Sequence, residues 1–281
     1  MNLFSDLIPL LIAIIFWGSY LVPMKKVKEY DPYFFQFLFC SAVLISSIVF
    51  SFFFAEFVLS PFAILSGFLF AVGNVFSLAA VKESGMSRAF PIWVGVGISV
   101  VFLFGVFFLS ESFASLLFAI IALVLVIAGV FLVSSTNDQK KESSTKGILF
   151  AVCAGILFGS YLVPFKLANM ELLSFLFPMS IGIFVGSLVI FLYKRPQIDA
   201  TILVSGSFSG FLWNIGNVAN FSVVSNFGLA LGSSLTQICL FIGILWGIFY
   251  FKEVKDRHKT ISIILGSILL FAGAILLAFS K

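Results

Sequence analysis

Charged side chains are scarce in this sequence of 281 residues. Asp, Glu, Lys and Arg make up 10% of it, whereas a soluble globular chain usually contains about 25%. Hydrophobic residues make up 61%, and the mean hydropathy is +1.20. A soluble core could not cover so much apolar surface, so lipid has to solvate most of it. The composition excludes an ordinary soluble domain and predicts an all-α integral membrane protein.

Residues that often carry enzyme or metal chemistry are also few. The single histidine, His258, lies in a charged loop, and Cys40, Cys153 and Cys239 lie in apolar runs without metal-ligand spacing. No HExxH or GxSxG motif and no pair of intramembrane carboxylates occurs. The basic residues are scattered over short loops and form no basic arm. We therefore expect no enzyme activity, metal, cofactor or nucleic-acid partner.

Apolar runs of about 20 residues, the length that crosses a bilayer as a helix, recur along the chain. The first run lacks a basic leader and a small-residue cleavage site, so we expect a membrane helix and not a removable signal. A polar stretch, SSTNDQKKESSTK, ends at Lys146 in mid-chain. The predicted organisation is a first five-helix unit (1–134), a polar cytoplasmic linker (135–146) and a second five-helix unit (147–281). The ten predicted spans are 5–24, 33–54, 60–81, 89–109, 113–134, 147–166, 172–193, 200–222, 228–250 and 260–279.

The two halves resemble each other at a nearly constant offset of 141 to 143 residues. GSYLVP occurs at 18–23 and again at 159–164, and SGFL occurs at 66–69 and again at 209–212. Asn74 matches Asn217 in a repeated Gly-Asn-Val triplet, and Glu111 matches Glu253. This spacing indicates a duplication. Because five is an odd number of spans, the sequence predicts two inverted five-helix repeats, a common plan of secondary transporters that work by alternating access.

The basic residues predict the orientation. Fourteen of the 16 Lys and Arg residues lie in alternate loops that share one side of the membrane, and only Lys166 and Lys281 lie on the other. The positive-inside rule assigns the first side to the cytoplasm. We therefore expect a multi-pass protein of the plasma membrane, with the lipid bilayer as a partner and both termini extracytoplasmic.

Neutral polar and aromatic residues occur inside the predicted spans, where no charged residue lies near a midplane. Asn214, Asn217 and Asn220 fall within about 120° of arc on one predicted helix. Such amides can join helices by hydrogen bonds, or they can bind a substrate. The candidate substrate-binding residues are Trp17, Ser19, Tyr20, Asn74, Trp93, Tyr161, Trp213, Asn214, Asn217 and Gln237.

Two acidic residues, Glu111 and Glu253, lie at matched span ends. They can reach the interface as ordinary snorkelling side chains, or they can form a gate or couple transport to a proton or sodium ion. Both possibilities remain open from the residues alone.

The chemistry of the candidate residues favours a small neutral substrate. An amide both donates and accepts hydrogen bonds, so it suits adjacent hydroxyl groups, and aromatic rings offer flat apolar surface. A cationic substrate would require a buried carboxylate, and a nucleotide would require a buried basic cluster. A sugar is therefore the favoured substrate.

Several short motifs in order resemble the glucose/ribose porter family of the drug/metabolite transporter superfamily. They are Phe16-Trp17-Gly18-Ser19, SGFLFAVGN at 66–74, Gly85-Met86-Ser87-Arg88 with Pro91, SGFLWNIGN at 209–217, and Ser233-Ser234-Leu235-Thr236-Gln237. The resemblance covers essentially the whole chain and implies a ten-helix permease for sugar uptake. It also implies that Trp17, Asn74, Trp213, Asn217 and Gln237 line the path.

Two other functions remain open. Relatives within the superfamily move amino acids and other metabolites, so an amino-acid or small-metabolite exporter is the first alternative. A non-transporting membrane sensor or assembly partner is the second, and it would bind a ligand without moving it across the membrane.

Overall fold

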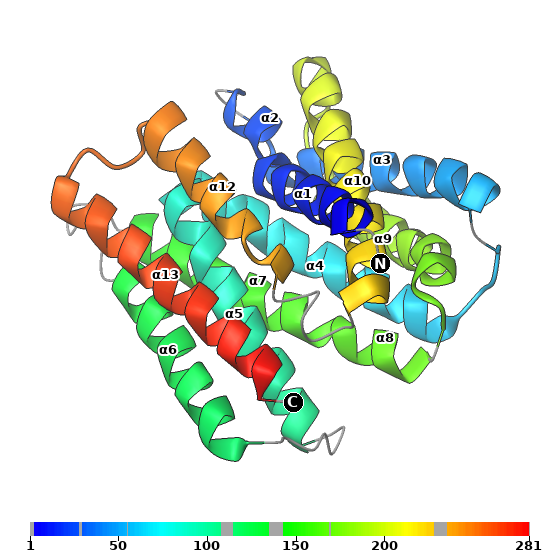
Figure 1. The fold of residues 1–281 in the computed structure, drawn as a ribbon. Helices are drawn as coiled ribbons and strands as arrows, with labels where there is room; N and C mark the ends of the chain where they lie inside the picture. The colour runs from blue at the N-terminus through cyan, green and yellow to red at the C-terminus, as the bar shows by residue number, and fades with distance from the viewer. Residues whose placement is uncertain are drawn as a thin grey trace.

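The structure is a computed structural model that describes residues 3–27, 30–54, 56–107, 115–134, 143–168, 170–227 and 235–280. Within these ranges all regular structure is helical and no strand occurs. Each of the ten predicted spans contains helix (Figure 1). The helices are α1 (Leu3–Ser19), α2 (Val22–Lys25), α3 (Pro32–Phe54), α4 (Pro61–Ser84), α5 (Met86–Phe107), α6 (Leu116–Ser134), α7 (Ser143–Ser160), α8 (Leu162–Ala168), α9 (Leu172–Lys194), η1 (Ala200–Ile202), α10 (Leu203–Phe227), α12 (Cys239–Leu245), η2 (Trp246–Tyr250) and α13 (Arg257–Phe279).

The protein is a multi-pass helical membrane protein. Six helical segments of the described chain are long and apolar enough to cross a bilayer. Three shorter apolar helices accompany them, at Leu117–Val133, Thr145–Ser160 and Cys239–Tyr250. Helix α10 is 25 residues long but is not among the six, because four asparagines and five serines reduce its hydropathy. A helix this polar has to be held among other helices and not surrounded by lipid.

The first predicted span and the sixth are both broken at the repeated GSYLVP motif. Helix α1 ends at Ser19, a turn follows at Tyr20 and Leu21, and α2 begins at Val22. In the second half a turn at Tyr161 separates α7 from α8. Proline explains both breaks, because Pro23 and Pro164 have no N–H to donate to the carbonyl four residues earlier. The sequence predicted single continuous spans here, and each is two helices.

Two other boundaries differ from the predicted ones. Helix α7 begins at Ser143, so the last four residues of the predicted linker are helical. In the ninth predicted span, the described part begins with two helical residues at 235–236 and a turn at 237–238, followed by α12 and the π-helix η2. Regular α-helix therefore covers less of this span than the apolar pattern indicated.

Local capping residues set the ends of several helices. Ser60 is the N-cap of α4, where its side chain accepts the N–H of Ala63. Gly85 ends α4 with a φ of +82°, a conformation that glycine adopts without steric cost. Asp256 caps α13 by accepting the N–H of His258. These caps place the loops between helices and thereby fix where the polar side chains of the loops lie.

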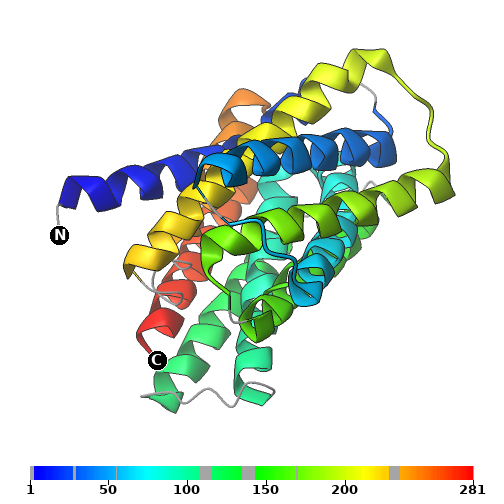
Figure 2. The same cartoon turned by 90° about the vertical axis from the view of Figure 1, so that its right-hand side faces the viewer.

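Eight helices form a closed series of packed neighbours. The order around the series is α5, α7, α4, α9, α3, α10, α1 and α12, and α12 returns to α5. Helices α6 and α13 pack side by side outside this series, next to α5 (Figure 1). Helices of the two sequence halves alternate over much of the series, and the view in Figure 2 shows α1 and α10 crossing each other. Segments far apart in sequence thus meet at the centre.

Glycine permits two of these crossings to be very close. A Cβ on Gly67 in α4 would overlap the carbonyl oxygen of Met179 in α9. A Cβ on Gly210 in α10 would overlap the carbonyl oxygen of Phe39 in α3. Backbone groups cannot move aside as side-chain tips can, so these two positions require a residue without a side chain.

Candidate functional site

The aromatic residues predicted for the site lie together where helices of both halves meet. The rings of Trp213 and Phe70 are 4.5 Å apart between centroids. Trp213 also lies 6.0 Å from Phe39, which in turn lies 6.0 Å from Tyr20. Ring contacts from Phe70 to Tyr161, from Phe70 to Phe158 and from Phe158 to Trp93 extend the set at 5.8, 5.2 and 6.3 Å. We call Tyr20, Phe39, Phe70, Trp93, Phe158, Tyr161 and Trp213 the central aromatic cluster.

Trp17 joins this cluster through a hydrogen bond. Its indole Nε1–H donates to the carbonyl oxygen of Trp213 at 3.3 Å, which ties α1 to α10. The ring lies so close to α10 that a Cβ on Gly216 would overlap its Cδ1 atom. Trp17 is half-buried. It therefore presents a flat ring and a polar edge beside the cluster.

The turns that break the first helix of each half are held by hydrogen bonds. The hydroxyl oxygen of Ser19 accepts the indole N–H of Trp246 at 2.9 Å. At the equivalent turn, Ser66 donates its hydroxyl to the carbonyl of Tyr161 at 2.8 Å. Ser19 is therefore engaged with another helix, while the Tyr161 ring remains in the central aromatic cluster.

Asn74 is fully buried, and both polar atoms of its side chain have protein partners. Its Nδ2 donates to Oε1 of Gln36 at 2.6 Å, and its Oδ1 accepts from the hydroxyl of Ser77 at 3.1 Å. Gln36, also fully buried, donates to the carbonyl of Ala71 at 3.0 Å. These bonds join α3 to α4. Of the two roles that the sequence left open for Asn74, they favour joining helices over binding a substrate.

Asn214 faces α3. Its Nδ2 donates to the hydroxyl oxygens of Ser46 at 2.8 Å and Ser47 at 3.2 Å. It also lines a groove of about 1090 Å³ between α1, α3 and α10. The groove is bordered by exposed apolar side chains such as Phe53 and Val204, so it suits lipid chains and not a sugar.

Asn217 differs from both of these asparagines. It is 3% exposed, and its Nδ2 has no hydrogen-bond partner among the residues that the structure describes. One turn later, the Oδ1 of Asn220 is likewise buried without a partner in that part of the chain. An unsatisfied buried amide group costs about 1–3 kcal/mol. Such groups are expected where a ligand or water supplies the missing bond.

Gln237 lies at the turn before α12, apart from the contacts that define the central aromatic cluster. It is half-buried, and its carbonyl accepts the N–H of Leu240 at 3.0 Å. Glu111 lies outside the described residues.

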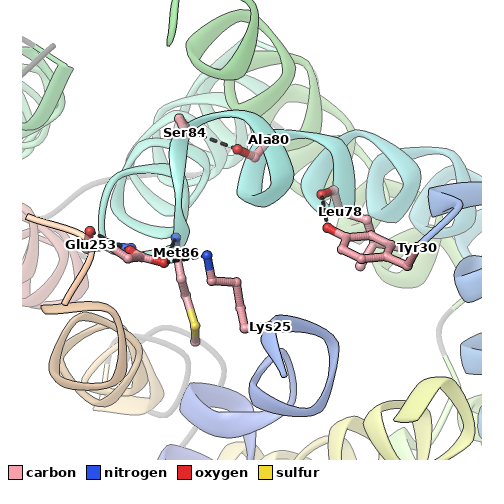
Figure 3. Close-up of polar contacts among 8 residues, drawn as sticks. Lys25, Tyr30, Leu78, Ala80, Ser84, Met86 and Glu253 are labelled. Carbon is pink, nitrogen blue, oxygen red and sulfur yellow. Dashed lines mark hydrogen bonds and ion pairs between the residues drawn. The ribbon is translucent and has the colours of Figure 1, made fainter. Parts of the chain in front are cut away.

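Glu253 forms a compact polar contact at one end of the helices, shown in Figure 3. Its carboxylate accepts the N–H of Met86 at 2.9 Å and both the N–H and the hydroxyl of Ser87 at 2.8 Å. The Nζ of Lys25, at the end of α2, lies 3.0 Å from its Oε1. The carboxylate therefore caps the N-terminus of α5, where the helix dipole favours a negative charge.

These contacts determine the charge of Glu253. Burial acts to raise the pKa of its carboxyl group. The positive charge of Lys25 and the backbone N–H groups of Ser87 and Met86 outweigh burial, and the pKa lies below the ordinary glutamate value. Glu253 is therefore ionised at neutral pH, which suits a structural contact better than a proton carrier.

Sequence reasoning missed several residues that form this region. Phe70 is the repeat counterpart of Trp213, so the repeat itself could have indicated it. Gln36 is one amide in an otherwise apolar run, and that isolation was an available signal. Phe39 and Phe158 carry no signal, because this chain contains 39 phenylalanines. Nothing in the sequence indicated that Lys25 contacts Glu253.

Aromatic and amide side chains enclosed between the halves of a multi-pass helical membrane protein are typical of the class of membrane transport proteins. Comparison with known protein families identifies the family within this class. The sequence model of the family described as "Sugar transport protein" matches residues 7–280, so the chain belongs to that family. This confirms the resemblance that the motifs indicated and the expectation of a transport protein that is not an enzyme.

Similar proteins agree over the full length. The chain is 31% identical over 287 aligned positions to the glucose uptake protein GlcU of Bacillus subtilis (strain 168), covering 98% of this chain and 99% of that protein. It is 28% identical over 292 positions to the probable glucose uptake protein GlcU of Bacillus anthracis, covering 100% of both. A solved crystal structure at 14% identity covers 97% of this chain and 96% of that one with a TM-score of 0.58, which shows a shared fold.

Proposed function

We propose that this protein is a secondary transporter that carries a neutral sugar, such as glucose or ribose, across the plasma membrane by alternating access. Membership of the sugar transport family along residues 7–280 carries the proposal. The relative at 31% identity is named a glucose uptake protein. The chemistry of the interior agrees, because the central aromatic cluster and the neighbouring amides contain no charged side chain.

The proposed architecture is ten crossings arranged as two inverted five-helix repeats. The packing of the helices supports it, because several of the most extensive packed pairs are related by exchanging the halves. Helix α1 of the first half packs on α10, and its counterpart α7 packs on α4. Likewise α3 packs on α10 while α9 packs on α4, and the last helices α6 and α13 pack on each other. Phe70 and Trp213, which are repeat counterparts, contact each other as expected near a two-fold axis.

We propose that the substrate binds beside the central aromatic cluster, with Trp17, Trp93, Tyr161 and Trp213 as ring surfaces. An aromatic ring can cover the C–H face of a sugar while an indole edge retains a polar group. The partners of Asn74, Asn214 and Ser19 favour helix-joining roles for these three predicted residues. The Nδ2 of Asn217 and the Oδ1 of Asn220, which have no partner in the described part of the chain, are the better candidates for binding hydroxyl groups.

We propose that the contact between Lys25 and Glu253 is a gate on the cytoplasmic side. It joins the end of α2, the start of α5 and the loop after η2, elements that have to separate if a path is to open between them. The depressed pKa of Glu253 favours a gating role over proton coupling. Glu111, its sequence counterpart, keeps its predicted coupling or gating role on the sequence match alone.

Uptake into proteoliposomes tests the proposed function. Labelled D-glucose, D-ribose and L-rhamnose would be offered with and without an inward proton gradient or sodium gradient, and L-glucose would serve as the stereochemical control. Saturable uptake of one sugar that excess unlabelled sugar blocks is the expected result. Tight vesicles with folded protein and no sugar flux would contradict it. Amino-acid flux would then support the exporter, and ligand binding without flux would support the sensor.

A further inference from the structure

The equivalent asparagines Asn74 and Asn217 differ in their hydrogen bonds, and the packing of the helices around them shows the origin of this difference. Gly67 and Gly210 are repeat counterparts, and they meet the carbonyl oxygens of Met179 and Phe39 respectively. Met179 in α9 therefore corresponds to Phe39 in α3, at an offset of 140 residues.

Burial along the two helices supports the same register. The pairs Phe35 and Phe175, Val43 and Ile183, and Ser47 and Ser187 are each 140 residues apart, and all six side chains are at most 1% exposed. At this register the counterpart of Gln36 is Leu176. Leu176 is also 1% exposed, so a buried amide of the first half is replaced by a buried hydrocarbon side chain in the second.

The replacement explains the hydrogen bonds of the two asparagines. Asn74 donates its Nδ2 to Gln36 and accepts from Ser77 at its Oδ1, so both of its polar side-chain atoms already have protein partners. Its counterpart Asn217 is also buried, but α10 packs there on α9, which carries Leu176 at the position that corresponds to Gln36. Its Nδ2 has no partner in the described part of the chain, which matches the loss of the glutamine oxygen.

Asn220 adds the complementary group. Its Oδ1 is a buried acceptor without a partner in the described ranges, one helical turn from the free donor of Asn217. At 100° per residue, Trp213, Asn217 and Asn220 lie within about 60° of arc on α10. Trp213 belongs to the central aromatic cluster, whereas the residues of α10 that line the lipid-facing groove, such as Asn214 and Val218, lie on a different face.

We propose that Asn217 and Asn220 form a hydroxyl-binding subsite that takes two neighbouring hydroxyl groups of the sugar, while Asn74 is committed to joining helices. A hydroxyl group both accepts and donates, so one hydroxyl can accept the Nδ2–H of Asn217 and the next can donate to Oδ1 of Asn220. Binding would satisfy two buried groups that are costly when unpaired. The inference rests on the proposed function, because it needs a polyhydroxylated substrate.

Binding and thermal stability of purified protein test the subsite together. Equilibrium dialysis with labelled D-glucose, D-ribose and L-rhamnose would first establish the sugar that wild type binds. Asn217→Ala and Asn220→Ala should each raise the Kd for that sugar by about 5- to 100-fold, the effect of losing a buried hydrogen bond. The matched control Asn74→Ala should lower the melting temperature, because it leaves Gln36 without its partner, and should change Kd by less than about 2-fold.

Leu176→Gln is the decisive variant. It places in α9 the amide that Gln36 supplies in α3, so it should occupy the free donor of Asn217. We expect a melting temperature equal to or above that of wild type and a Kd raised by about 10-fold or more, a change of about 1.4 kcal/mol. A destabilised Leu176→Gln protein, or one with wild-type affinity, would overturn the register argument.

The outcomes separate the subsite from the function. If wild type binds a sugar and Asn74→Ala weakens binding as much as Asn217→Ala, the subsite is wrong and the sugar carrier stands. If wild type binds none of the three sugars, both the proposed function and the subsite are overturned.

Discussion

Replacing Glu253 by glutamine should weaken the contact between α2, α5 and the loop after η2. The variant Glu253→Gln keeps one oxygen, which can still accept from Ser87. Its amide NH2 would then face the Met86 N–H and the Lys25 ammonium, and neither of these groups can accept a hydrogen bond. Two favourable interactions of the carboxylate would be lost, and both are charge-assisted because the carboxylate is ionised.

The size of the effect follows from these contacts. A hydrogen bond to a charged group contributes about 1.5–3 kcal/mol. The side chain of Glu253 is 10% exposed, so solvent replaces little of what is lost. We expect the closed contact to lose about 3–6 kcal/mol for the two interactions together. If the contact is a gate, the loss will shift the protein toward a state in which the cytoplasmic side is open.

Melting temperature and accessibility to a thiol reagent would be measured on the same samples, with a single cysteine introduced at position 87. We expect Glu253→Gln to increase labelling and to lower the melting temperature by several degrees. Lys25→Gln is the matched variant, because it removes the ion pair but leaves the bonds to Met86 and Ser87 possible, and it should give a smaller change. Since the cysteine itself removes the hydroxyl of Ser87, the parent for comparison is Ser87→Cys. Wild-type stability and labelling in Glu253→Gln would refute the reasoning.

The same contact predicts a dependence on pH. The folded-state pKa of Glu253 lies below its unfolded value, near 4.3 for glutamate, so its stabilisation is complete above about pH 5. It is lost as pH falls through the lower folded-state pKa, and Glu253→Gln should remove that acid-dependent part. Uptake that titrates near neutral pH and becomes pH-independent in Glu253→Gln would contradict this assignment of charge.

Two further predictions concern packing and topology. Gly210→Ala should destabilise the protein by about 1–3 kcal/mol, because the added Cβ meets the backbone of Phe39. In the control Gly243→Ala the added Cβ meets only side-chain atoms at 3.4 Å or more, so this change should be tolerated. Equal melting temperatures of the two variants would show that the crossing of α10 and α3 can widen. A cysteine replacing the exposed Glu171, between the sixth and seventh predicted spans, should react with an impermeant reagent added outside intact cells. One replacing the exposed Lys255 should react only after permeabilisation, and the reverse pattern would refute the predicted orientation.

The sequence predicted most of the helices because most spans are long apolar runs, and length and hydropathy are local properties. It did not predict the breaks after Ser19 and Ser160, because the apolar pattern continues across them and only the following proline indicates an interruption. It also predicted aromatic site residues that do lie in one cluster, such as Trp213 and Tyr161. Their role in substrate binding remains a prediction.

The roles of the polar residues depended on contacts that the sequence could not provide. Asn74 and Asn217 occupy the same motif, and only the helix opposite each one distinguishes a paired amide from a free one. Glu253 and Lys25 are separated by most of the chain, so no local pattern relates them. Pairing of this kind becomes predictable once the register between the halves is known, because equivalent positions can then be compared.

There is a physical reason why equivalent positions of the two halves carry different polar side chains. A sugar has no two-fold symmetry, so a site between two inverted repeats cannot bind it with identical groups from both halves. The proposed repeat concentrates hydrogen-bonding side chains where α1 meets α10, with Trp17, Trp213 and Asn217. The equivalent meeting of α7 and α4 has the apolar Phe158 and Phe70 at the tryptophan positions, and its asparagine is already paired. We infer that one half-interface recognises the hydroxyl groups, while the other supplies apolar surface and holds the helices together.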